Sequence, residues 1–198
     1  MAEVLFVIGP QRSGTTVTAR VLGAHPDIAP GGVGFHPYAR WDIPFMAELG
    51  GNPDKQPLIA ALRKAAYEHA GRYFLAKIAL PVSAESLTWP RLLGQFPKSM
   101  TVLTDRDTEA TGKSWAALEY LESQRPTDEI GWMRLHESWT DLYRQQILAA
   151  EDSCPGRTWR VELAAICLDP AAELGPVFTR LGLSPPPAAA YSVVERTP

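Results

Sequence analysis

The sequence has only two cysteines, Cys154 and Cys167, and their spacing matches no metal-binding motif and builds no disulfide framework. It also lacks any apolar run approaching the ~18 residues that identify a membrane-spanning helix. The apolar run at residues 4–8 is short and follows Glu3, so we expect no signal peptide. These absences favour a protein of the reducing cytoplasm that has no membrane partner.

An excess of charge of one sign is absent as well. Nineteen Lys and Arg residues stand against 22 Asp and Glu, which leaves a net charge of -3. Bulk charge therefore gives no indication of a nucleic-acid partner. The 198 residues are 45% hydrophobic and 21% charged, as is usual for globular proteins. We expect a single domain over residues 1–198, which is long enough to bury a core.

Strand and helix patterns alternate along the chain. Short apolar runs with β-branched residues predict strands at residues 4–8, 73–80 and 100–104, and RTWRV at residues 157–161 is a candidate for a fourth strand. Helical spacing predicts helices at residues 14–24, 107–122 and 170–181, and a long one that begins at Thr127. This alternation predicts an α/β fold of three layers around a central parallel sheet. Residues 29–57, rich in Gly and Pro, and residues 184–198 are expected to be irregular.

The first expected strand leads into the sequence GPQRSGTT at residues 9–16. A strand, a glycine turn and a helix N-terminus in succession aim several backbone N–H groups at one point, where the helix dipole also favours an anion. Arg12 adds a planar fork of donors that suits phosphate oxygens. Thr15, however, stands where the P-loop of a nucleotide-hydrolysing protein has its lysine. The loop predicts a phosphate-like ligand that needs no such lysine.

This loop, together with AHPD at residues 24–27, closely resembles the sulfotransferase family. The resemblance implies a P-loop-like strand–loop–helix that holds the 5′-phosphosulfate of 3′-phosphoadenosine 5′-phosphosulfate (PAPS), the sulfonate donor, without a metal ion. It implies that Arg12 also takes part in catalysis. The donor-binding residues that it implies in the loop are Gly9, Gln11, Arg12, Ser13, Gly14, Thr15 and Thr16.

A second motif, DRDTEATGKS at residues 105–114, resembles the family's site for the donor's 3′-phosphate. The family has an Arg at the end of this strand and a Ser eight residues later, and Arg106 and Ser114 have that spacing. An Arg at a strand tip and a Ser about two turns into the next helix can reach the same ligand. Thr108 stands where the family usually has Pro.

A third stretch, AKIALP at residues 76–81, resembles a family segment that carries a lysine and a histidine. The resemblance implies that Lys77 contacts the bridging oxygen and stabilises the departing phosphate, where negative charge grows. The histidine position of that segment is Ala79 here. His36 is therefore the candidate general base, since a histidine titrates near neutral pH. The alternative is that His36 is a loop residue without a catalytic role.

Two other functions remain open. A P-loop kinase or NTPase would use residues 9–16 and take Asp105 as its magnesium ligand. A non-catalytic nucleotide-binding protein would keep the fold and lack the base, in agreement with Ala79 and the short C-terminus. For the transferase, we expect a small-molecule or glycan acceptor with a hydroxyl or amine, bound largely by residues 30–72. That segment includes the large side chains Phe35, Tyr38, Trp41, Phe45 and Met46.

Overall fold

A computed structural model gives the fold of the chain. The ranges that it describes are residues 2–10, 12–30, 57–69, 71–80, 93–116 and 154–194, together with residues 130, 131, 134, 137, 141, 145, 148, 151 and 152.

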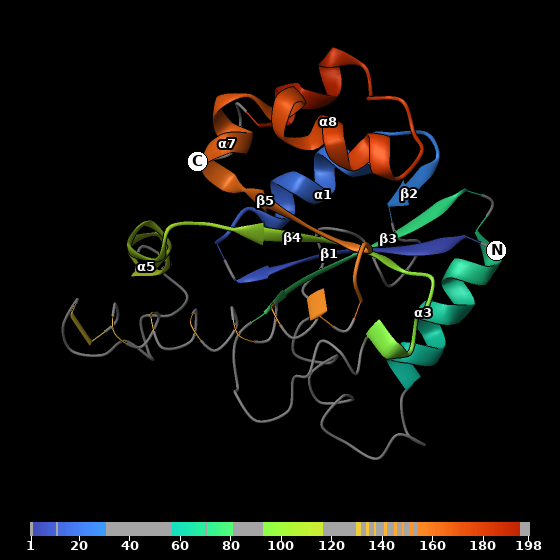
Figure 1. Cartoon of the computed structure of the whole chain (residues 1–198), viewed down its shortest axis with the longest axis horizontal. Coiled ribbons are helices and arrows are strands. Elements are labelled where there is room, and N and C mark those ends of the chain that lie inside the picture. Colours follow the sequence, from blue (N-terminus) through green and yellow to red (C-terminus); the bar gives the residue numbers. More distant parts are fainter. Residues whose placement is uncertain are drawn as a thin grey trace.

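A five-stranded sheet forms the centre of the structure, and every pair of neighbouring strands in it is parallel (Figure 1). The strand order is β2-β3-β1-β4-β5, so β1 lies in the middle. The strands are β1 Glu3–Pro10, β2 Ile28–Pro30, β3 Tyr73–Leu80, β4 Met100–Asp105 and β5 Thr158–Glu162. Because the strands are parallel, the carboxyl ends of β3, β1 and β4 meet at one edge of the sheet.

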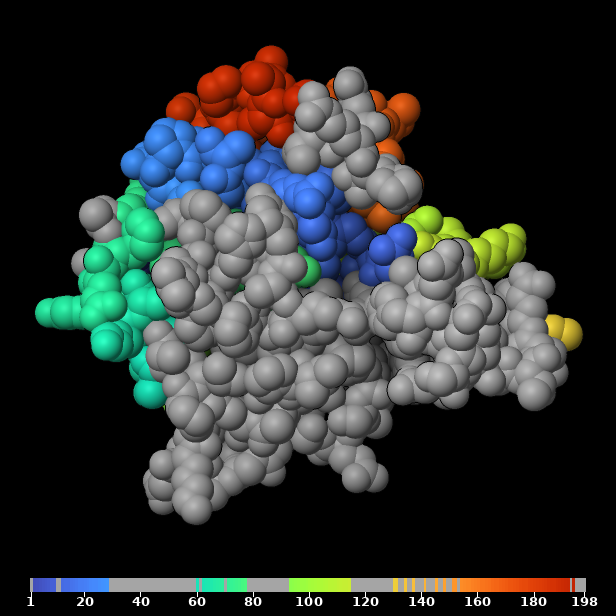
Figure 2. Space-filling view, turned by 180° about the vertical axis from the view of Figure 1, so that it is seen from behind, coloured from blue at the N-terminus to red at the C-terminus, as the bar shows by residue number. Residues whose placement is uncertain are grey.

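Helices cover both faces of this sheet (Figure 1). One face carries α1, α7, α8 and the 3₁₀ helix η2, and the opposite face carries α3. Figure 2 shows the C-terminal residues in red lying against the light-blue end of α1. The helices are α1 Thr15–Gly23, α3 Pro57–Glu68, α5 Thr108–Ala116, α7 Leu163–Leu168, α8 Pro170–Arg180 and η2 Ala188–Val193. The predicted three-layer α/β fold is confirmed.

The alternation of side chains along β1 explains why both layers are needed. Leu5 and Val7 pack into the core on the α1 and α8 side, together with Phe178. Phe6, on the other side of the strand, meets the ring of Phe96 edge-on at 5.4 Å. A strand buried on both faces reads as a continuous apolar run, and this is the pattern that predicted β1.

The expectation of irregular structure was wrong at two places. Ile28–Pro30 forms the short edge strand β2, which pairs with β3, and Ala188–Val193 forms η2. Three prolines precede η2, and Val194 at its end is buried in the core of the α1 layer, so packing against α1 determines this segment more than local propensity does. The helices α3 and α7 were not predicted.

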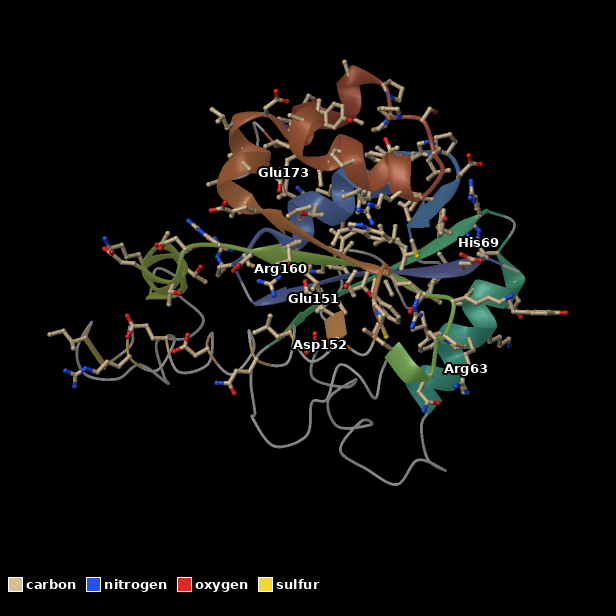
Figure 3. All side chains as sticks on the ribbon, viewed as in Figure 1. Arg63, His69, Glu151, Asp152, Arg160 and Glu173 are labelled. Atoms are coloured by element: carbon tan, nitrogen blue, oxygen red, sulfur yellow. The ribbon has the colours of Figure 1, made fainter. Side chains whose placement is uncertain are left out.

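The long helix predicted from Thr127 lies partly outside the described residues. Every described residue from 130 to 152 is helical. Near the end of this stretch Glu151 accepts two hydrogen bonds of 2.9 Å from Arg160 on β5, and both side chains are labelled in Figure 3. This paired contact raises the pKa of Arg160 and joins the helical stretch to the sheet.

Candidate functional site

The loop after β1 turns sharply at two residues with positive φ. Arg12 has φ 70° and Gly14, the N-cap of α1, has φ 94°. Glycine takes this conformation without strain, whereas for Arg12 it costs on the order of 1–2 kcal/mol. Gly14 has no side chain, so it cannot cap the helix. The first N–H groups of α1 are therefore directed at the loop. This is the geometry of an anion-binding helix N-terminus.

Close packing at the base of the loop explains its glycines. A Cβ at Gly9 would overlap with Thr104 Oγ1 and would lie 2.5 Å from Ser13 Oγ. A Cβ at Gly14 would lie 2.7 Å from a methyl group of Leu163. Gly9 is therefore required by space, and Gly14 chiefly by its φ angle.

A buried hydrogen bond joins the loop to β4. Ser13 Oγ and Thr104 Oγ1 lie 2.7 Å apart, and both residues are fully buried. Thr104 also donates to the carbonyl oxygen of Ile8 at 3.4 Å. Sequence reasoning missed Thr104, although a threonine as the last buried residue of an apolar strand was a signal that it has a partner. The pairing fixes the loop against the end of the neighbouring strand.

Three cationic side chains come from three different elements to this edge of the sheet. Arg12 belongs to the loop, Arg106 follows β4, and Lys77 is near the end of β3. Strand register accounts for the placement of Lys77, since it pairs with Val7 on β1, two residues before the loop begins at Gly9. A cluster of like charges has no stabilising role by itself, which suggests an anionic ligand.

Hydrogen bonds join these cations to the loop and to α5. Arg12 Nε donates to Ser114 Oγ at 2.8 Å, and Arg106 Nη1 donates to the carbonyl oxygen of Arg12 at 3.0 Å. Lys77 Nζ donates to Thr16 Oγ1 at 3.3 Å, and the Lys77 side chain is only 8% exposed. The hydrogen bond from Arg106 therefore holds the backbone of Arg12, which is the one non-glycine residue with positive φ among those described.

The helix α5 is placed by its own cap. Asp107 Oδ1 accepts from the N–H of Ala110 at 2.9 Å, and this cap fixes the first turn of α5. Ser114 lies two turns further along and reaches Arg12. The structure thus brings Arg106 and Ser114, eight residues apart, to the same loop. Of the predicted residues, Gln11 and His36 lie outside the described residues.

The residue considered as a magnesium ligand, Asp105, faces its own neighbour. Its Oδ1 accepts from the N–H of Arg106 at 2.9 Å. Within the described ranges, no group of three or more His, Cys, Asp or Glu side chains is placed to hold a metal ion. In the same part of the chain, none of the helices combines the length and the apolar character that crossing a bilayer requires.

Comparison with known proteins places these features in a family. The model described as "Sulfotransferase family" matches residues 5–187. No protein of curated function matches the sequence.

Three solved structures illustrate the likeness of fold. A sulfotransferase from Alicyclobacillus acidocaldarius is 18% identical with a TM-score of 0.60, and the alignment covers 93% of this chain and 82% of that one. Mouse sulfotransferase SULT7A1 complexed with PAP is 13% identical with a TM-score of 0.64, covering 99% and 65%. Retinol dehydratase in complex with androsterone and inactive cofactor PAP is 18% identical with a TM-score of 0.55, covering 98% and 63%.

Proposed function

The chain belongs to the sulfotransferase family, and we propose that it transfers a sulfonate group from PAPS to a hydroxyl or amine acceptor by in-line displacement. One observation carries the proposal: Arg12, Arg106 and Lys77 converge from three elements on the loop at the N-terminus of α1. A nucleotide with two separate anionic groups would be bound well by cations that come from different elements. The mouse structure that shares the fold contains PAP, the desulfonated donor.

In the proposed complex, PAPS would supply a sulfonate that is already activated by its bond to a phosphate. Gly9, the N–H groups at the start of α1 and the Thr15 and Thr16 hydroxyls would surround the 5′ end, with Gln11, Ser13, Gly14 and Arg12 completing the loop. Arg106 and Ser114 would bind the 3′-phosphate. A charge-assisted hydrogen bond of this kind contributes about 1.5–3 kcal/mol.

Lys77 would stabilise the leaving group. Its ammonium is held by Thr16, so it is oriented before any ligand arrives. A buried cation is effective where negative charge develops on an oxygen, because little water screens it. We propose His36 as the base that takes the acceptor's proton, on the strength of its position in the sequence after α1.

For the acceptor we propose a small molecule. A protein of the same fold was crystallised with androsterone, which is a small apolar alcohol. A glycan acceptor stays a prediction from the sequence.

Ligand-induced thermal shift tests the donor site directly. We expect PAP without magnesium to raise the melting temperature, AMP to raise it much less, and Mg-ATP to have little effect. Arg12→Ala should weaken PAP binding by about 10- to 150-fold, which is 1.5–3 kcal/mol. Arg180→Ala, which removes the same charge from α8, is the matched control. Stabilisation by Mg-ATP instead of PAP would support a kinase and refute the proposal.

Turnover separates the transferase from a non-catalytic relative. Incubation with labelled PAPS and a panel of phenols, alcohols and amines should yield a labelled product with at least one of them. Tight binding of PAP with no transfer to any acceptor, and no hydrolysis of the donor, would leave a nucleotide-binding protein.

A further inference from the structure

A cavity of about 680 Å³ lies between α3 and the segment at residues 93–99. Its wall includes Ala2, which directly precedes β1, Val4 at the start of β1, and Ser99, which directly precedes β4. These are the amino ends of the strands. The cavity is therefore at the opposite edge of the sheet from the loop at Gly9. The six residue steps from Glu3 to Gly9 span about 20 Å at ~3.3 Å each.

The inner surface of the cavity is apolar. Val4, Ala66 and Phe96 line it, and each is almost fully buried in the protein. Tyr67 extends this surface outward and is 67% exposed. A volume in the range of ~300–1,000 Å³ with an apolar lining is typical of pockets that bind small molecules.

The entrance of the cavity is positively charged. Three of the lining residues are cationic, Arg63, Lys64 and Lys98, and one, Glu3, is acidic. Lys64 also forms an ion pair of 3.8 Å with Glu68 on the same helix. Arg63 is anchored over the Phe96 ring at 5.6 Å and donates to Gln95 Oε1 at 2.8 Å. Figure 3 shows Arg63 on α3 beside the 93–99 segment. The chain as a whole carries a net charge of -3, so this local excess of positive charge is not a consequence of composition.

We propose that this cavity is a second binding site, separate from the candidate donor site, for a small amphipathic molecule with an apolar body and a single anionic group. The body lies against Val4, Ala66 and Phe96. The anionic group lies among the cations at the entrance.

Calorimetric titration with decanoate tests the site, with 1-decanol as the uncharged probe of equal chain length, both below the concentrations at which they aggregate. We expect one decanoate per chain and much weaker binding of decanol. Arg12→Ala, which alters the donor loop, should leave the affinity for decanoate within about twofold. Absence of saturable binding, equal affinity for the two probes, or loss of decanoate binding in Arg12→Ala would each overturn the proposal.

Surface variants test the charge at the entrance without disturbing the core. Lys98→Gln should weaken decanoate by roughly two- to fivefold, and Lys64→Gln/Lys98→Gln by roughly three- to thirtyfold, as expected for partly exposed charge pairs. Arg180→Gln removes one positive charge on the opposite face of the sheet and should leave the affinity unchanged. An equal effect of Lys98→Gln and Arg180→Gln would mean that only net charge matters, and no specific site would remain.

Discussion

Replacing Gly9 by alanine is the most direct test of how the donor loop is built. The new Cβ would overlap with Thr104 Oγ1 and would lie 2.5 Å from Ser13 Oγ and 2.9 Å from the Thr104 carbonyl oxygen. The carbonyl belongs to the backbone of β4, and the pairing of this strand with β5 limits its movement. The two hydroxyls are held by their mutual hydrogen bond of 2.7 Å.

The magnitude follows from the two ways in which the site can respond. Overpacking of a close-packed interior typically costs about 1–3 kcal/mol. Rotation of Thr104 away from Gly9 would break its hydrogen bond to Ser13, which adds about 0.5–1.5 kcal/mol. We therefore expect Gly9→Ala to lower the free energy of unfolding by about 2–4 kcal/mol. It should also weaken PAP binding, because the loop is displaced.

Urea denaturation measures the loss of stability, and Gly94→Ala provides the matched control. Gly94 is helical, and a Cβ there meets nothing within 4 Å. The same chemical change should stabilise the protein by about 0.4–1 kcal/mol at this position. If Gly9→Ala and Gly94→Ala had the same effect on stability, the packing at the base of the loop would not be as described.

Three further predictions concern single side chains. Arg106→Ala should remove most of the preference for PAP over AMP, a loss of about 10- to 150-fold for one charge-assisted contact; equal affinities in the unchanged protein would argue against a 3′-phosphate site. Lys77→Ala should lower kcat by roughly 10²–10³-fold for every acceptor while PAP affinity changes little, and a rise in KM alone would indicate a binding role instead. Burial raises the pKa of Tyr73, whose hydroxyl donates to the carbonyl oxygen of Leu181 at 2.9 Å. The neutral Tyr73 hydroxyl therefore contributes its full stabilisation below about pH 10, the pKa in the unfolded chain, and loses it as the pH rises through the higher pKa of the folded protein. Between pH 9 and 11, the urea midpoint of Tyr73→Phe should fall less steeply than that of the unchanged protein.

The sequence predicted the parts of the fold that depend on local pattern. The apolar runs predicted β1, β3 and β4 to within two residues, because a strand buried on both faces has a largely apolar sequence. β5 was predicted as well, from RTWRV at residues 157–161, although Val161 is the one buried residue in this strand. The edge strand β2 was missed because it has three residues, Ile28–Pro30, and its place is determined by pairing with β3. Such short edges carry too little pattern to be recognised.

The candidate site, like the fold, could be predicted only where it depends on a local sequence pattern. The loop and the pair Arg106 and Ser114 could be found from spacing, since each belongs to one local segment. The contact between Arg12 and Ser114 could not be found in this way, because 102 residues separate them and strand order alone brings β1 and β4 together. Thr104 was missed for the same reason.

The burial of Thr15 explains why the loop has a threonine where a P-loop has its lysine. Thr15 is only 3% exposed, so its side chain points into the protein and a lysine there would have to bury its charge. The cations are instead Arg12 on the loop, Lys77 on β3 and Arg106 directly after β4. In the proposed function this arrangement distributes charge over both ends of a nucleotide, whereas one P-loop lysine serves a single phosphate chain. Because the three cations lie on different elements, their relative positions depend on the strand register, and a register shift would remove the site even with every residue present.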